Sequence, residues 1–390
     1  MTPFFKHLAT RGAVLSMTTM TKTMNSNNTP RNARLTKLCQ KLQDIIGTDA
    51  GGRGMKSLIV QDDLFHASMI FGSLGFIDNG ARQEFKPKNV VVMSGFPCCV
   101  TQTPPTETDG PPGTFALARC AAVMGHDVTV VTDQCNHDVF MAGLTNLAMP
   151  SESESSSSNS VKVGSIRLKS FPPDTQWTSD DEKQLDDLRN YCDLLLACER
   201  AGPGQDGKCY TMRGINMNEK NLIAPLHKLA AESSGNRSYP FCAIGDGGNE
   251  LGMGKVIQQI VDNPQIQNGS KIGCVIPADH LVAASVSNWG GYAFAVGAVA
   301  VHAQHRLESQ SKAVGDTNDS DDDEGSVRKM AKEWILRCIP TQEEEREFLQ
   351  RCVDAGCRDG VSGKMEATVD GMPLERSLQC LQDLQEAALS

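Results

Sequence analysis

Residues 90–132 read VVVMSGFPCCVTQTPPTETDGPPGTFALARCAAVMGHDVTVVT. The stretch opens with a valine-rich apolar run and passes through a loop of Pro, Thr, Gly and acidic residues. A helical segment, 114–124, and a second valine-rich run follow. Strand, loop, helix and strand in this order predict a parallel sheet covered by helices on both faces.

The same alternation extends along the chain in both directions. Apolar residues at helical spacing predict two helices before the first strand, at about Ala33–Ile46 and Asp62–Leu74. Short apolar runs predict strands at Val90–Ser94, Val128–Thr132, Leu194–Cys198, Phe241–Ile244 and Ile272–Ile276. We expect a three-layer α/β fold with a mainly parallel central sheet and helices on both faces. In such a fold, the loops at the carboxyl ends of the strands form the ligand site.

Composition divides the chain into an expected leader, 1–33, and an α/β domain, 34–390. No Asp or Glu occurs from Met1 to Gln43, where basic residues stand among Ser, Thr and Asn. This composition is typical of a transit peptide, which implies the mitochondrial matrix or a plastid, or of a disordered tail on a cytoplasmic protein. Two surface insertions are expected, a Ser-rich one near 151–160 and an Asp-rich one near 309–325.

Charge and cysteine content argue against several classes of partner. The formal net charge is -10 and the pI is near 5.3, so no nucleic-acid or anionic-membrane partner is expected. The longest apolar stretch, 292–302, is shorter than the roughly 20 residues of a membrane span. The 14 cysteines follow no short repeating spacing, which favours a reducing compartment. We expect a small-molecule substrate. The sequence is compatible with a homodimer as well as a monomer.

The first candidate loop precedes the predicted helix at Thr114. Glu107 and Asp109 are suited to hold a divalent cation or to act as general bases. The helix end at Thr114 offers backbone N–H groups to a substrate anion. The alternative is an ordinary helix cap flanked by solvated acids.

The second candidate loop is Gly245–Lys255, GDGGNELGMGK. Five glycines in eleven residues favour close approach of the backbone to a ligand, here at Gly247 and Gly248. The other candidates in this loop are the oxygen donors Asp246, Asn249 and Glu250 and the cation Lys255. The loop matches neither a Walker A nor a dinucleotide-binding pattern, so no nucleotide cofactor is expected.

Two arginines after the third predicted strand, Arg200 and Arg213, are suited to bidentate binding of a substrate carboxylate. Ordinary ion pairs are the alternative for each. The chain also contains histidines in no triad or metal-ligand spacing, which we interpret as structural: His66, His126, His227 and His280.

Three motifs together resemble the C-terminal domain of the D-glutamate cyclase family. They are TETDGPPGT at 106–114, ERAGPGQDGKCYTMRG at 199–214 and IGDGGNELGMGK at 244–255. VVVMSGFP before the first motif and Thr368–Gly371 near the end are similar as well. The resemblance covers nearly the whole chain and implies a lyase that converts D-glutamate to 5-oxo-D-proline and water, mitochondrial in animals. Animal members carry an additional N-terminal hydro-lyase-like domain, in contrast to the basic leader here.

For that reaction we expect Asp246 or Glu250 to accept the ammonium proton of the substrate. A divalent cation, Mn²⁺ or Mg²⁺, or Lys255 would draw charge from the γ-carboxylate. The expected metal ligands are Glu107, Asp109, Asp246, Asn249 and Glu250, and Thr114, Arg200, Arg213, Gly247 and Gly248 are expected to bind the substrate. Related microbial domains include metal-dependent phosphohydrolases, which would use nearly the same residue types on a small phosphate ester. A non-catalytic binding domain is a third possibility.

Overall fold

The computed structural model describes residues 30–79, 83–150, 162–231, 237–314 and 324–390. Most of the expected leader and the whole of the expected insertion 151–160 lie outside these residues. The expected insertion 309–325 lies outside them only in part. Helix α9, Ser287–Val314, continues into this range, and α10, Glu324–Cys338, begins within it.

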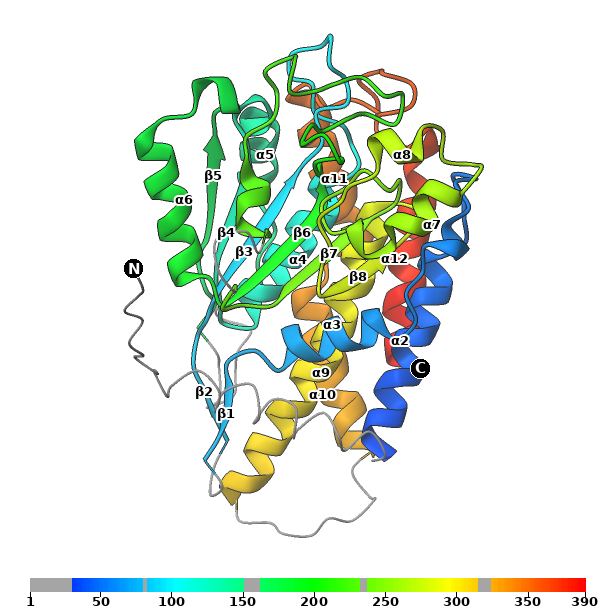
Figure 1. Ribbon diagram of the computed structural model, residues 1–390. Coiled ribbons are helices and arrows are strands. Elements are labelled where there is room, and N and C mark those ends of the chain that lie inside the picture. The colour runs from blue at the N-terminus through cyan, green and yellow to red at the C-terminus, as the bar shows by residue number, and fades with distance from the viewer. Residues whose placement is uncertain (1–29, 80–82, 151–161, 232–236, 315–323) are drawn as a thin grey trace, which may run out of the picture.

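Six parallel strands form the central sheet (Figure 1), in the order β5-β4-β3-β6-β7-β8. Their bounds are β3 Asn89–Gly95, β4 Asp127–Asp133, β5 Ile166–Phe171, β6 Leu194–Arg200, β7 Phe241–Gly245 and β8 His280–Ala283. The chain moves outward from β3 to β5 on one side and from β6 to β8 on the other. The order therefore reverses between β3 and β6, which is where open α/β sheets bind their ligands.

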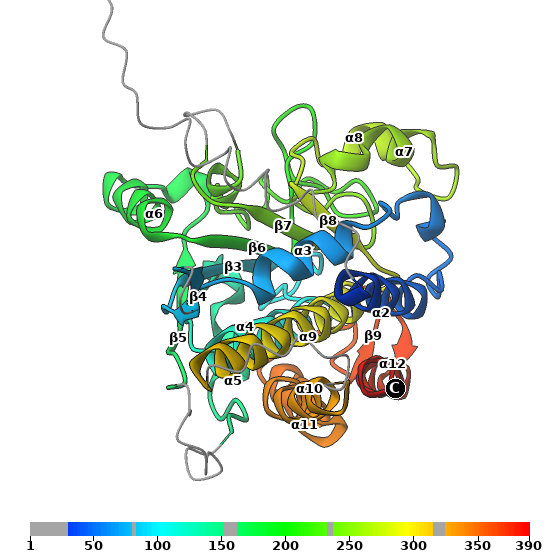
Figure 2. The same cartoon turned by 90° about the horizontal axis from the view of Figure 1, so that it is seen from below.

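Helices cover both faces of the sheet, as Figure 2 shows. One face packs against α3 Asp63–Gly72, α4 Pro111–Val123 and α9, with α2 Pro30–Ile46 and α5 His137–Leu144 beside them. Outside this layer lie α10, α11 Gln342–Asp354 and α12 Leu374–Leu389. The other face packs against α6 Ser179–Tyr191, α7 Ile257–Asp262 and α8 Gly269–Ile272. The predicted three-layer α/β fold is confirmed.

Alternation of side chains along the central strands explains both covered faces. In β3, Val90 and Val92 belong to the core under α4 and α9, whereas Val91 and Met93 belong to the core on the α6 side. All four are fully buried. Because both faces of the sheet bury apolar side chains, the strand reads as a continuous valine run.

Two small hairpins complete the fold among the described residues. One joins β1 Phe76–Asp78 to β2 Gln83–Phe85, and the other joins β9 Thr368–Val369 to β10 Met372–Pro373. None of the described helices is long and apolar enough to cross a lipid bilayer.

The strand predicted at Ile272–Ile276 is wrong. Ile272 ends α8, and the sixth strand is β8, His280–Ala283. Ile272 and Cys274 are buried like strand residues, and a short buried run does not distinguish a strand from a helix end. Sequence analysis also missed β5, because this edge strand is only half-buried along most of its length.

A buried ion pair fixes the strand ends near the reversal of strand order. The Arg200 guanidinium at the end of β6 bonds to the Asp133 carboxylate at the end of β4. It also donates to Gly95 O of β3 at 3.4 Å and to Ala224 O at 3.0 Å. Each ionised side chain is 1% exposed. Arg200 therefore joins three strands, and both Nη atoms of its guanidinium are occupied by groups of the protein.

We predict that Arg200→Met lowers the free energy of unfolding by about 3–5 kcal/mol, because Asp133 would keep a buried charge without a partner. Urea unfolding at pH 7 measures the loss. The matched control is Arg346→Met, which breaks the exposed pair with Glu375 and should cost less than about 1 kcal/mol. Equal, small losses in both variants would contradict a structural role for Arg200.

Candidate active site

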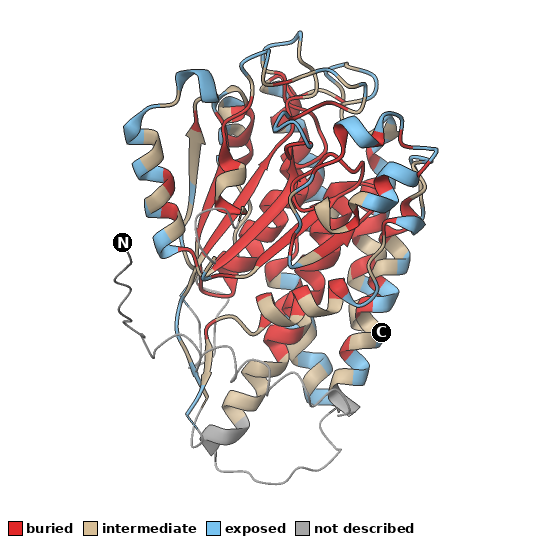
Figure 3. Cartoon of the chain, in the orientation of Figure 1, coloured by how far each residue is buried: buried red, intermediate tan, exposed pale blue. Residues whose placement is uncertain are grey.

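Six carboxyl side chains are brought together above the reversal of strand order, and we call them the acid cluster. They are Glu107, Asp109, Glu199, Asp246, Glu250 and Asp370. Glu199 lies in β6, one residue before its end, and the other acids lie in the loops that follow β3 and β7 and in one loop of the C-terminal region. These loops lie above the buried centre of the sheet in Figure 3. The first five residues are at most 7% exposed.

Asp109 is fixed because it caps helix α9. Its carboxylate accepts the backbone N–H of Ser287 at 2.8 Å and that of Asn288 at 2.8 Å. Asn288 in turn caps α4, because its amide oxygen accepts the N–H of Gly110 at 2.8 Å and of Gly113 at 3.0 Å. Each helix thus caps the N-terminus of the other. This reciprocal cap holds the first acid loop at the N-terminus of α9.

Close packing of the two helices makes the reciprocal cap possible. A Cβ atom at Gly113 would lie 2.9 Å from Asn288 Cα, and one at Gly291 would lie 2.7 Å from Gly113 Cα. Only glycine permits these backbones to approach so closely.

Glu199 projects into the cluster because β6 contains a bulge. The register with β3 passes from Ser94↔Cys198 to Gly95↔Arg200, which leaves Glu199 without a partner strand residue. Its φ of 44° lies in the left-handed region, which non-glycine residues rarely adopt. Bulges and such strained residues are concentrated near active sites, where they redirect a side chain. Its carboxylate accepts the Ser287 hydroxyl at 2.6 Å.

Glu250 shapes the second acid loop. Its two carboxylate oxygens accept the N–H groups of Gly247 at 2.8 Å and of Gly248 at 2.7 Å. Asn249 joins this loop to the segment that contains Tyr210, because its side-chain amide donates to Tyr210 O at 2.7 Å. The glycine amides, expected to bind substrate, are therefore engaged by Glu250.

Asp246 has one oxygen engaged and one without a partner. Its Oδ1 lies 2.7 Å from Nη1 of Arg53, whereas Oδ2 is buried and has no hydrogen-bond partner among the described residues. A buried carboxylate oxygen without a partner is energetically costly. The Asp246 Oδ2 atom is therefore the position in the cluster where a bound ligand would gain the most binding free energy.

Arg53 joins the N-terminal and C-terminal parts of the chain at the cluster. Its Nη2 lies 3.0 Å from Oδ2 of Asp370, so one guanidinium pairs with Asp246 and Asp370. Asp49 holds the loop of Arg53 by accepting its N–H at 2.9 Å. Asp370 has a φ of 53°, and its turn is held by Asp359, which accepts Gly371 N–H at 2.7 Å.

The C-terminal region also covers Glu107. A Cβ at Gly360 would lie 2.0 Å from Glu107 Oε2, so a larger residue at this position would displace the Glu107 carboxylate. The Cys98 thiol donates to the same oxygen at 3.2 Å. Glu107 thus lies beneath two loops, away from bulk water.

Burial dominates the ionisation of the cluster. It raises the pKa of Asp246 to about 6, although Arg53 opposes the shift, and that of Asp370 to about 7, with Asp246 adding to the shift. Burial and neighbouring carboxylates raise the pKa values of Glu107, Asp109 and Glu199 well above the usual range. Burial and mutual repulsion therefore favour the protonated forms of these acids when no cation is bound.

Three acids meet the distance requirement for one metal ion. Single oxygens of Asp109, Glu199 and Asp246 lie within 4.8 Å of one another. Hard carboxylate oxygens suit a divalent cation such as Mg²⁺ or Mn²⁺, and the partnerless Asp246 Oδ2 is one of the buried oxygens available. The residues present thus fit a cation, and a cation would relieve the mutual repulsion of the acids.

Several residues expected at the site have other contacts. Lys255 Nζ lies 2.6 Å from Asp63 Oδ2, in a separate cluster, and Arg200 is occupied as described above. The helix expected to start at Thr114 begins at Pro111, and the Thr114 N–H donates to Gly110 O at 2.9 Å. Asn288 accepts the N–H groups of Gly110 and Gly113 at this end of α4. These amides and that of Thr114 are therefore engaged within the protein and are not free to bind an anion.

Arg213 lies on an exposed loop, where it donates to Val361 O at 3.2 Å. The hydrogen bond with Cys98 is the main cause that lowers the pKa of the Cys99 thiol, and the charges of Arg358 and Arg213 add to it, which places both guanidiniums near the loop that leads to Glu107. Of the residues that sequence reasoning assigned, Glu107, Asp109, Asp246, Asn249 and Glu250 lie at the cluster. It did not assign Glu199, Asp370, Arg53, Ser287 or Asn288.

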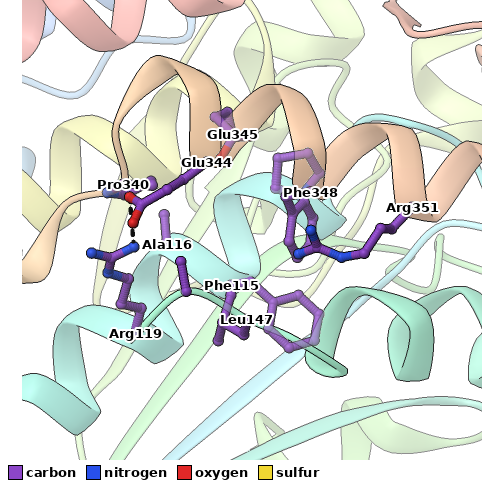
Figure 4. Close-up of a pocket in the computed structure, with 11 residues that line it drawn as sticks. Phe115, Ala116, Arg119, Leu147, Pro340, Glu344, Glu345, Phe348 and Arg351 are labelled. Atoms are coloured by element: carbon purple, nitrogen blue, oxygen red, sulfur yellow. Dashed lines mark hydrogen bonds and ion pairs between the residues drawn. The ribbon is translucent and has the colours of Figure 1, made fainter. Parts of the chain in front are cut away.

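A hollow between α4 and α11 is separate from the acid cluster (Figure 4). Its volume of about 20 Å³ is sufficient for about one water molecule. Phe115 and Phe348 line it, and Arg119 faces Glu344 across it at 2.9 Å. Its small size leaves no room for a substrate of the size of an amino acid.

Comparison with known proteins agrees with the motifs. The family described as D-glutamate cyclase-like, C-terminal, matches residues 42–385. The chain belongs to this family. It is 30% identical over 351 residues to the human protein named D-glutamate cyclase, mitochondrial.

The family match confirms the resemblance drawn from the three motifs and includes every acid of the cluster. The aligned region covers 87% of this chain and 50% of the human protein. The chain therefore spans about half the length of this curated relative.

Proposed function

We propose that this protein is a lyase that converts D-glutamate to 5-oxo-D-proline and water. The single observation that carries the proposal is the buried carboxylate of Asp246, with one free oxygen among acids at the reversal of strand order. The family, and the name of the human relative, supply the substrate.

The cyclisation requires two protons to move. The α-ammonium must lose a proton before its nitrogen attacks the γ-carboxyl carbon, and the amide then formed must lose a second. Both protons leave with one γ-carboxylate oxygen as water. A group that first accepts and then donates a proton near neutral pH therefore serves the reaction best.

Asp370 is suited to this proton transfer, because it is not one of the proposed cation ligands and burial raises its pKa to about 7 in the metal-free protein. Arg53 contacts the carboxylates of both Asp370 and Asp246. In our proposal, Asp370 carries protons between the ammonium and the leaving oxygen. Asp246 directs its free oxygen to the reactants and to the cation.

We propose that Asp109, Glu199 and Asp246 hold a divalent cation, Mn²⁺ or Mg²⁺. When bound, the cation supplies positive charge that draws electron density from the γ-carboxylate. Glu250 keeps the second acid loop in place through Gly247 and Gly248. Burial excludes water, and a folded substrate brings amine and carboxyl together.

Arg213 is our candidate for binding the α-carboxylate, and Arg358 lies near the same loop. Arg358 Nε is buried and has no partner among the described residues, so it has a donor available for a carboxylate oxygen. Arg200 is not part of this proposal, because its Nη1 and Nη2 bond to Asp133, Gly95 O and Ala224 O and its side chain is 1% exposed.

The alternative, a phosphohydrolase, fits the arrangement less well. Phosphate sites in α/β folds commonly use free amides at a helix N-terminus or in a glycine loop. Here Asn288 occupies the amides at α4, and Glu250 occupies those of Gly247 and Gly248. Side-chain oxygens of the protein thus fill the positions where a phosphate group would bind.

We also propose that the protein acts in the mitochondrial matrix. The proposal rests on the acid-free, basic composition from Met1 to Gln43 and on the name of the human relative. Processing would produce a shorter mature chain, so the mass of the protein isolated from cells should lack N-terminal residues. A mass that includes Met1 would contradict import with cleavage.

We predict that Asp246→Asn lowers kcat for D-glutamate by at least about 100-fold and leaves the fold intact. Asn keeps the side-chain volume but neither takes up a proton nor balances the charge of a cation. Formation of 5-oxoproline with Mn²⁺ or Mg²⁺ present measures turnover, and circular dichroism checks the fold. The matched control is Asp262→Asn in α7, an exposed position, which should retain wild-type turnover.

The same assay with wild-type protein compares D-glutamate, L-glutamate and p-nitrophenyl phosphate. Turnover of D-glutamate alone supports the proposal. Hydrolysis of the phosphate ester without consumption of glutamate would favour the phosphohydrolase. Near-normal activity of Asp246→Asn would remove Asp246 from the reaction.

A further inference from the structure

Two histidines that stand far apart in the sequence meet at a second cluster. His66 lies one turn beyond Asp63, the first residue of α3, and His280 is the first residue of β8. One ligand atom from each of Asp63, His66 and His280 lies within 4.8 Å of the other two. The cluster therefore combines a carboxylate with two imidazoles from separate elements.

The spacing of two of these atoms suits a tetrahedral metal ion. Asp63 Oδ1 lies 3.3 Å from His280 Nδ1, which is long for a hydrogen bond between charged groups. Two ligands each about 2.0 Å from a tetrahedral zinc ion would lie about 3.3 Å apart. Asp63 and His280 would need little movement to share an ion.

The second oxygen of Asp63 is held by other groups. Its Oδ2 accepts Lys255 Nζ at 2.6 Å and the Leu281 N–H at 2.8 Å. These contacts fix the carboxylate plane and leave Oδ1 toward the histidines, as outer hydrogen bonds do for metal ligands. This is also the location of Lys255, which sequence analysis assigned to the active site.

The third ligand is available as a neutral imidazole. A ring nitrogen of His66 is one of the three atoms that lie within 4.8 Å of one another, and an imidazole with an ordinary pKa of about 6.5 is mostly neutral at pH 7 and offers a lone pair. The rings of His66 and His280 lie 5.5 Å apart between centroids. His66 and His280 are both partly exposed, so an ion and a water molecule have access from solvent.

We propose that Asp63, His66 and His280 form a second metal site, for Zn²⁺ or a similar borderline ion, with water as the fourth ligand. Two imidazoles and one carboxylate favour such ions, whereas the all-oxygen acid cluster favours Mg²⁺ or Mn²⁺. The site lies at the amino end of β8, where α3 crosses below the strands in Figure 1. The acid cluster lies at the opposite, carboxyl edge of the sheet.

An ion at this site would join α3 to β8. Both elements pack in the core around α9, and Asp63 already links them through the Leu281 N–H. The bound ion adds ligand bonds from both sides of this contact. It therefore stabilises the fold and takes no part in the proposed reaction.

The experiment titrates metal-free, full-length protein with Zn²⁺ and, in parallel, with Co²⁺, whose visible absorption reports tetrahedral ligands. We expect one site of micromolar affinity or tighter and a rise in the thermal midpoint with Zn²⁺. His66→Gln and His280→Gln should each weaken binding by at least about 10-fold. His227→Gln, which changes a histidine outside the cluster, should bind as the wild type does.

Asp246→Asn separates this site from the acid cluster. It should retain the Zn²⁺-dependent rise in thermal midpoint, whatever becomes of glutamate turnover. If a histidine variant fails to fold, modification of the wild type by diethyl pyrocarbonate replaces it, and Zn²⁺ should protect His66 and His280. Absence of Zn²⁺ binding, binding unchanged in both histidine variants, or modification unaffected by Zn²⁺ would overturn the proposal.

Discussion

The reciprocal cap between α4 and α9 is the contact on which the candidate active site depends. Asp109 caps α9, and Asn288 caps α4, so the two helix ends and the first acid loop form one unit. Ser287, the first residue of α9, also donates its hydroxyl to Glu199 at the bulge of β6. The loop after β3 and the end of β6 are thereby positioned around one helix terminus. The positive end of α9 faces the acids and partly balances their charge.

The buried acids make the stability of the metal-free protein depend on pH. The direction is opposite to that for ordinary salt-bridged carboxylates. Burial raises the pKa of Asp246 to about 6 and of Asp370 to about 7. Their contribution to stability is full below the unfolded pKa, near 4, and is lost as pH rises through these values. A divalent cation reverses this dependence of stability on pH, because it binds the ionised form of the carboxylates. Arg53 offsets part of the charge, but one guanidinium does not balance six carboxyls.

The site residues that could be predicted from the sequence are those in a loop that directly follows a buried strand. The valine runs of β3 and β4 and the acids Asp109 and Asp246 could be placed because each loop follows a buried strand. Glu199 and Asp370 lay within recognised motifs, but their roles depend on left-handed backbone that composition does not reveal. Arg53 and Asn288 gave no signal, because their contacts join segments far apart in the chain. Arg200 was misleading for the opposite reason, since a buried partner, Asp133, comes from another strand.

In our proposal, the buried acids of the metal-free protein hold protons, and a bound cation displaces these protons. Calorimetric titration of the metal-free protein with Mn²⁺ at pH 7, in two buffers of different ionisation enthalpy, counts the protons released. Ligand carboxylates must be deprotonated to bind, so the account predicts release of about one proton or more per ion. Asp246→Asn should abolish tight binding and the release with it. Tight binding of Mn²⁺ with no proton released would contradict the account.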